Sequence, residues 1–96
     1  MRPSTVLEMN RPLIRATATR FRAANPRIFW ATQDGSTLNG AGLDLVVDAL
    51  PGATAVDLGG LQEELEARLR VPVTVWTPAD LPGGLRDALL ADARPV

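Results

Sequence analysis

The chain has 96 residues, a length that fits a single domain. It contains no Cys, His or Tyr, and all ten of its basic residues are Arg. These absences exclude disulfides, thiol nucleophiles, Cys/His zinc sites, imidazole bases and lysine Schiff bases. An enzyme made from the remaining side chains would depend on carboxylates that hold a metal ion.

The charge is unevenly distributed, although the net charge is only −1. Residues 1–33 hold six Arg and one acid, a balance of +5, whereas residues 34–96 hold four Arg and ten acids, a balance of −6. This polarity would orient a charged partner, but the composition is not that of a nucleic-acid-binding domain. No apolar run approaches the roughly 20 residues of a membrane helix, and no signal peptide opens the sequence. We therefore expect a cytoplasmic protein without membrane or direct nucleic-acid contacts.

The N-terminal part predicts a leader followed by a helix. Residues 1–9 are expected to be a flexible leader, with a single domain over residues 10–96. Asn10 is a candidate N-cap, and Pro12 falls in the first turn. An amphipathic helix that ends at Asn25-Pro26 is predicted by a set of positions on one helical face, namely Leu13, Ile14, Thr17, Phe21 and Ala24.

Three arginines form a second stripe on this helix, at Arg11, Arg15 and Arg22. The stripe is either a solvated flank of the helix or a grip for phosphate or for an acidic partner. On the second interpretation the three side chains are candidate partner-binding residues.

A short strand and a loop are predicted before the most strongly patterned strand, and another short strand is predicted further along the chain. Arg27 to Trp30 is expected to be a strand, because aromatic and β-branched residues fit a pleated surface. Residues 32–42 are polar and glycine-rich, which is typical of a loop or an irregular short helix. Val71 to Trp76 is another predicted strand, with Pro72 at its start or on an edge of the sheet.

Residues 43–48 give the clearest strand pattern. A period of two places Leu43, Leu45 and Val47 on one face. The opposite face carries Asp44, Val46 and Asp48.

Two further helices are expected, the first capped by Asp57 and the last capped by Asp80. Their apolar stripes are Leu58, Leu61, Leu65 and Leu69 in the first, and Leu81, Leu85 and Leu89 in the last. The order of elements predicts a small α/β (α+β) domain, in which helices pack on a mixed three-stranded sheet.

Asp44 is the residue around which metal chemistry would have to be built. Two metal ions need convergent carboxylates, most economically an Asp-x-Asp on one strand and a third acid on the neighbouring strand. Here the position two residues before Asp44 is Gly42, and the position expected opposite it is Thr74. Asp48 lies about 13 Å further along the same strand. These residues are not expected to hold a pair of Mg²⁺ ions; Asp44 is either a surviving ligand or a relic with a local role.

Seven segments, taken in order, match a known pattern: Asn25-Pro-Arg-Ile-Phe29, Leu43-Asp-Leu-Val-Val-Asp48, Leu50-Pro-Gly-Ala53, Asp57-Leu-Gly-Gly-Leu-Gln-Glu-Glu-Leu65, Val71-Pro-Val-Thr-Val-Trp-Thr-Pro78, Leu85-Arg-Asp87 and Ala93-Arg-Pro-Val96. They resemble the minimal nucleotidyltransferases. These are short DNA-polymerase-beta-like domains that are commonly encoded beside HEPN-domain partners as toxin–antitoxin pairs. The resemblance covers residues 10–96 without large gaps and implies a nucleotidyltransferase-like fold.

The active-site motif departs from that family. The family pattern is Phe-Gly-Ser-x-Ala-Arg-Gly, a short loop and then Ser-Asp-x-Asp-Leu, in which Gly-Ser cradles phosphates and the two aspartates hold metal. On this chain Phe29 matches, but Gly-Ser becomes Trp30-Ala31 and Ala-Arg-Gly becomes Gln33-Asp34-Gly35. The positions at which the catalytic set is altered or left as a relic are Trp30, Ala31, Gly42, Asp44 and Thr74.

The expected function is therefore binding without catalysis. The altered residues predict a pseudoenzyme, and the resemblance implies an antitoxin-like subunit whose partner in a hetero-oligomer is a helical HEPN-type toxin. The absence of Lys and the abundance of Ala and Arg indicate a prokaryotic genome. No catalytic residue, cofactor or metal is expected. The partner-binding candidates are Arg11, Arg15, Arg22, Trp30 and Trp76; each tryptophan is either an aromatic platform or ordinary core packing.

Two alternatives keep the nucleotide. In the first, an active nucleotidyltransferase moves AMP from ATP to a partner protein, with Mg²⁺ held by Asp44 and by Asp34 or Asp48. In the second, the chain is a sensor that has kept the nucleotide pocket without the chemistry.

Overall fold

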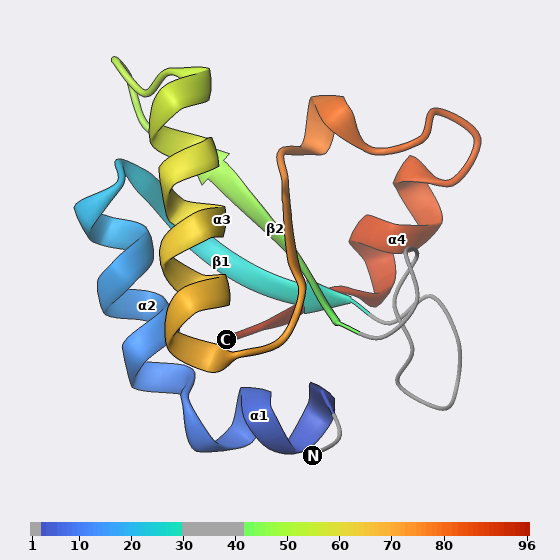
Figure 1. Ribbon diagram of the computed structural model, residues 1–96. Helices are drawn as coiled ribbons and strands as arrows, with labels where there is room; N and C mark the ends of the chain where they lie inside the picture. The colour runs from blue at the N-terminus through green and yellow to red at the C-terminus, as the bar shows by residue number, and fades with distance from the viewer. Residues whose placement is uncertain (1–2, 30–41) are drawn as a thin grey trace.

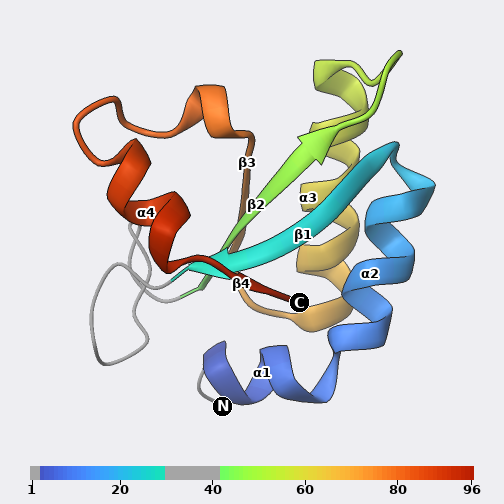
Figure 2. The ribbon, with the colours of Figure 1, turned by 180° about the vertical axis from the view of Figure 1, so that it is seen from behind.

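The computed structural model describes residues 3–29 and 42–96. Its centre is a mixed four-stranded sheet in the order β3-β2-β1-β4 (Figure 1; all four strands are labelled in Figure 2). The strands β1 and β2 are antiparallel, as are β1 and β4, whereas β2 and β3 run parallel. The strand bounds are β1 Ala23–Phe29, β2 Leu43–Ala49, β3 Val73–Trp76 and β4 Arg94–Pro95.

The helices cover both faces of this sheet, as the two opposite views show (Figures 1 and 2). One face is packed against α1, α2 and α3, and the other carries the 3₁₀ turn η1 and helix α4. Their bounds are α1 Pro3–Met9, α2 Arg11–Arg20, α3 Ala55–Leu69, η1 Pro78–Asp80 and α4 Arg86–Asp92. Within the described residues, no helix combines the length and the apolar character needed to cross a membrane.

The residues of β2 alternate between two faces as predicted, but both faces are covered by a core, including the face expected to be polar. Leu43, Leu45 and Val47 face the main core, which α1, α2 and α3 complete. Val46 faces the small core with Phe29, and this core also contains Leu81, Trp76, Leu89, Leu90 and Ala93. Because both faces of β2 are covered, its first five residues are all buried.

Residues 3–9, expected to be a flexible leader, form helix α1 instead. Val6 and Leu7 are buried in the main core. Asn10 does occupy the N-cap position of α2, but its side-chain Nδ2 donates to the carbonyl oxygen of Val6 at 2.8 Å and does not cap α2. Two adjacent apolar residues are too few to show a helical period, so the sequence carried no signal for α1.

Helix α2 ends at Arg20, before the predicted terminator at Asn25-Pro26. Arg22 has a φ of 59° and turns the chain into β1. Asn25 has a φ of 52°, and the register of β1 against β2 shifts between Ala24 and Arg27. Asn tolerates the left-handed conformation and Pro has no N–H to leave unpaired, so this dipeptide suits an irregularity in a strand.

Helix α3 begins earlier than predicted, with Thr54 at the N-cap position in place of Asp57. The backbone N–H of Thr54 donates to Asp57 Oδ2 at 2.9 Å, and that of Asp57 donates to Thr54 Oγ1 at 3.4 Å. This reciprocal pair is a capping box. The predicted leucine stripe is confirmed, because Leu61, Leu65 and Leu69 are buried and Leu58 packs against them.

The C-terminal region differs most from the prediction. Asp80 ends the short turn η1, where its Oδ2 accepts from Thr77 Oγ1 at 2.8 Å, and it does not cap α4. Leu81 is buried, but Leu85 is 48% exposed because α4 starts only after Gly83-Gly84. The fourth strand, β4, has two residues and is too short to show a period of two, so three strands were predicted.

The exposed edge of β3 is closed by side chains of α3. The backbone N–H of Val73 donates to Glu66 Oε2 at 3.1 Å, and that of Val75 donates to Gln62 Oε1 at 3.0 Å. An edge strand whose N–H groups are already satisfied is a poor template for strand addition by another chain. The N–H groups of Val73 and Val75 are therefore not available for strand addition.

Candidate functional site

Asp44 lies at the small-core face of β2 and is completely buried. Its Oδ1 accepts a hydrogen bond from the indole Nε1 of Trp76 at 3.0 Å. Opposite it on β1 is Phe29, which is also buried. A carboxylate in such surroundings is stabilised by donated hydrogen bonds, because burial otherwise penalises its charge.

The position two residues before Asp44 is closed to side chains. Gly42 is buried, and a Cβ atom built on it would lie 2.2 Å from the carbonyl oxygen of Pro72. That same oxygen accepts from the backbone N–H of Leu43 at 2.8 Å. The backbone therefore holds Gly42 against the residue that precedes β3. Any other residue at this position would have to push the start of β2 away from Pro72.

The residue beside Asp44 on the neighbouring strand is Thr74, as the sequence predicted. A pair of Mg²⁺ ions requires several convergent carboxylates. Here Asp44 accepts a hydrogen bond from Trp76. The two positions at which further acids would be needed are Gly42 and Thr74. Within residues 3–29 and 42–96, the side chains thus do not fit a two-metal centre, and no three acids cluster there.

Asp48, the acid that could have been recruited, is engaged elsewhere. Its Oδ1 accepts from Arg27 Nη2 at 2.7 Å and its Oδ2 accepts from Asn25 Nδ2 at 3.2 Å. It thereby supports the irregular part of β1, where Asn25 has a positive φ. Asp48 therefore belongs to the packing of β1 on β2 and does not join Asp44.

The rest of the altered motif lies outside the described residues. This applies to the relic positions Trp30 and Ala31, and also to Asp34 and Gly35. The site described here therefore consists of Asp44 with its neighbours on β2 and β3.

Trp76 lies half-buried against the small core, with its indole N–H turned to Asp44. The ring packs in a cluster with Phe29, Val46 and Leu81. These contacts are those of a side chain that packs in the core, one of the two interpretations of Trp76; the other was an aromatic platform. The hydrogen bond itself was not predicted, although one signal existed: residues 74 and 76 share a face with Asp44, and a buried indole N–H needs an acceptor.

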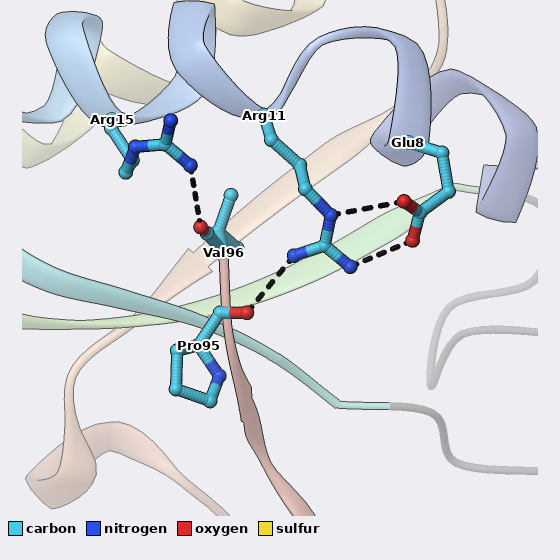
Figure 3. A network of polar contacts seen from close by, with 5 residues as sticks. All are labelled: Glu8, Arg11, Arg15, Pro95 and Val96. Carbon is cyan, nitrogen blue, oxygen red and sulfur yellow. Dashed lines mark hydrogen bonds and ion pairs between the residues drawn. The ribbon is translucent and has the colours of Figure 1, made fainter.

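Two of the three candidate arginines hold the C-terminal strand (Figure 3). Arg11 donates from Nη1 to the carbonyl oxygen of Pro95 at 3.0 Å and forms a two-bond ion pair with Glu8, at 2.7 and 3.1 Å. Arg15 donates from Nη1 to the carbonyl oxygen of Val96 at 2.8 Å. These contacts account for both side chains within the chain itself, on the side of α2 that faces β4.

Arg22 is the third candidate and is exposed. Its Nη1 donates to the carbonyl oxygen of Gly52 at 3.3 Å, and its own carbonyl oxygen accepts from the backbone N–H of Leu50 at 2.9 Å. It thus braces the turn between β2 and α3. The three arginines do not form one site, because Arg22 contacts this turn while Arg11 contacts Pro95 of β4 and Arg15 contacts Val96 directly after it.

The comparison with solved structures agrees with this architecture. No protein-family model and no curated protein matches the chain. A solved structure described as "putative minimal nucleotidyltransferase" is similar over 100% of this chain and 97% of its own, with 29% sequence identity and a TM-score of 0.80. The chain thus has the nucleotidyltransferase-like fold that its sequence predicted, with one strand more than expected.

Proposed function

We propose that this chain is a catalytically degenerate member of the nucleotidyltransferase fold that acts by binding another protein. Its partner is a helical HEPN-type toxin, and the chain serves as the antitoxin-like subunit of a hetero-oligomer. Association either covers the active site of the toxin or holds the toxin in an inactive assembly.

The observation that carries this proposal is the burial and hydrogen bonding of Asp44. Its carboxylate is completely buried, and Oδ1 is hydrogen-bonded to the indole of Trp76 at 3.0 Å. A metal ligand on this atom would have to displace that hydrogen bond. Gly42 adds a second obstacle, because a carboxylate two residues earlier would collide with Pro72.

The magnitude of the expected loss argues against residual turnover. Losing one group that stabilises a transition state costs about 2.7–4 kcal/mol, or roughly 10²–10³ in rate. Two of the three expected metal-holding positions are Gly42 and Thr74. Mg²⁺ also gives up its water shell reluctantly, so a single carboxylate would bind it weakly. The proposal therefore requires neither Mg²⁺ nor ATP.

The partner class comes from the resemblance to minimal nucleotidyltransferases, which are commonly encoded beside HEPN-type proteins. The short chain is consistent with a protein that gains stability from a partner, because small domains bury a smaller fraction of their surface. Any such complex would be stabilised by mass action through the concentration of the partner.

A transfer assay tests the loss of chemistry. The purified chain is incubated with the product of its adjacent gene, labelled ATP and Mg²⁺, and label on either protein is measured. The proposal expects no label above the background of an Asp44→Ala variant. Label that depends on Asp44 would instead establish the active enzyme that transfers AMP.

A binding assay tests the positive part of the proposal. The chain and the product of the adjacent gene are co-expressed and passed over a size-exclusion column, where a stable complex is expected. Two separate peaks at micromolar concentration would contradict the binding function. Calorimetry of the chain with millimolar ATP is run in parallel, and heat of binding there would identify the nucleotide sensor.

A further inference from the structure

The outward side of α3 has an unusual composition for an exposed helix surface. Opposite its buried leucine stripe lie Val56, Gly59, Glu63 and Ala67, all exposed. We call these four residues the outer face of α3. A solvent-facing helix side normally carries charged and polar side chains, yet this one presents a single carboxylate over three turns.

The aliphatic part of this face is conspicuously exposed. Val56 is 82% exposed, and Leu50 in the preceding turn is 42% exposed. The whole stretch from residue 49 to residue 56 has no charged side chain, and all of its residues except Ala53 are exposed. Runs of exposed apolar residues are unfavourable in water unless they serve a contact.

Gly59 has no explanation among the described residues 3–29 and 42–96. A Cβ atom built on it would meet none of their atoms within 4 Å, and its φ is not in the left-handed range. Its neighbour Gly60 differs, because a Cβ atom there would lie 2.8 Å from the ring of Phe21. Glycine inside a helix is unfavourable relative to alanine, so Gly60 follows from internal packing whereas Gly59 does not. A close approach by another molecule would account for Gly59.

The charges of this face indicate what approaches it. Glu63 makes no hydrogen bond or ion pair among the described residues, whereas the adjacent Glu64 is paired with Arg20 at 3.5 Å. A complementary surface would offer aliphatic side chains to Val56 and a cation to Glu63. An amphipathic helix with a flanking Lys or Arg meets both requirements, and the missing side chain at Gly59 allows two helices to pack near the short end of the usual 8–10 Å separation.

We infer that the outer face of α3 is the docking surface for a basic amphipathic helix of the protein partner. This inference deepens the proposed binding function and rests on it. A second copy of the chain is a poorer occupant, because a two-fold pairing centred on this face brings the same carboxylate of both copies together.

Three variants and three matched controls test the surface. Val56→Asp, Gly59→Gln and Glu63→Arg alter the outer face of α3. Leu85→Asp, Gly84→Gln and Asp87→Arg make the same changes at exposed positions around α4. Each chain is co-expressed with the product of the adjacent gene, and the dissociation constant of the complex is measured by calorimetry. Circular dichroism checks that each variant is folded; Gly59→Gln in particular replaces a poor helix former by a better one.

The expected result separates the two sets. Val56→Asp and Gly59→Gln should weaken the complex about tenfold or more, and Glu63→Arg should weaken it about fivefold at low salt and less at high salt. The controls should change the dissociation constant less than about twofold. A Lys-to-Glu or Arg-to-Glu change on the partner helix should restore affinity toward Glu63→Arg.

Three other results would overturn the inference. If the complex forms and the two sets of variants bind alike, the surface is wrong while the proposed binding function stands. If no complex forms with any chain, the binding function fails and this surface fails with it. If the chain alone dimerises and Val56→Asp dissociates the dimer, the occupant is a second copy and not a basic helix.

Discussion

Replacing Gly42 by Ala should destabilise the fold by an amount that can be worked from its surroundings. The new Cβ would lie 2.2 Å from the carbonyl oxygen of Pro72, and real Cβ atoms essentially never come within 3.0 Å of another atom. The start of β2 must therefore move away from β3 by at least the difference, 0.8 Å. That movement stretches the hydrogen bond from Leu43 N to the same oxygen, now 2.8 Å long.

The two costs of this movement add. Overpacking costs about 1–3 kcal/mol, and weakening one buried hydrogen bond costs about 1 kcal/mol more. The sum is about 2–4 kcal/mol, which in a chain of this size corresponds to a melting temperature lower by roughly 10–20 °C. Thermal and urea unfolding followed by circular dichroism measure both quantities.

Gly84→Ala is the matched control, because a Cβ atom there meets no atom of the described part of the chain within 4 Å. Its melting temperature should equal the wild-type value or exceed it by up to about 5 °C, since Gly→Ala at an open site stabilises by at most about 1 kcal/mol. If Gly42→Ala unfolds at the same temperature as Gly84→Ala, the close contact with Pro72 does not constrain this position. The argument that an acid cannot stand two residues before Asp44 would then fail.

Three further predictions concern separate parts of the fold. Trp76→Phe removes the indole donor from buried Asp44 and should lower the free energy of unfolding by about 1–3 kcal/mol, measured by urea titration; no loss would mean that this bond is not needed. Gly59→Ala should raise the free energy of unfolding by about 0.4–1 kcal/mol, and a decrease would reveal an internal constraint on that glycine. The pKa of Glu8 lies below its usual value because of its hydrogen bond to Arg11. The stabilisation from this pair is therefore present above the unfolded-state pKa and lost as the pH falls through the folded-state pKa. The difference in melting temperature between wild type and Glu8→Gln should accordingly shrink on acidification, and a pH-independent difference would contradict the pairing.

The sequence predicted those parts of the fold in which a period extends over several residues. The alternation over residues 43–48 identified β2 and both of its faces, and the leucine stripe identified α3. The pairing of Asp44 with Thr74 was also predicted, because two parallel strands with clear periods leave few registers. Long periodic elements are therefore well determined by the order of apolar residues alone.

The parts that were missed depend on contacts between distant segments. Helix α1 is fixed by the burial of Val6 and Leu7, and β4 by hydrogen bonds to β1 and to two arginines of α2. The closed position at Gly42 depends on how near Pro72 comes, a distance that no pattern in either segment encodes. Local sequence also misplaced the ends of α2 and α4, where Asn25 and Asp80 have other roles.

The altered positions around Asp44 are linked by the geometry of two parallel strands. An acid at position 42 meets the backbone of Pro72, and an acid at position 74 would place a second carboxylate beside one that is already completely buried. Two neighbouring buried carboxylates repel each other unless a cation compensates them. Each single step toward a metal-binding set is therefore unfavourable in this packing, as long as Trp76 donates to Asp44. The outer face of α3 carries no such constraint, because its residues are exposed, and the binding function proposed there is independent of what happens at Asp44.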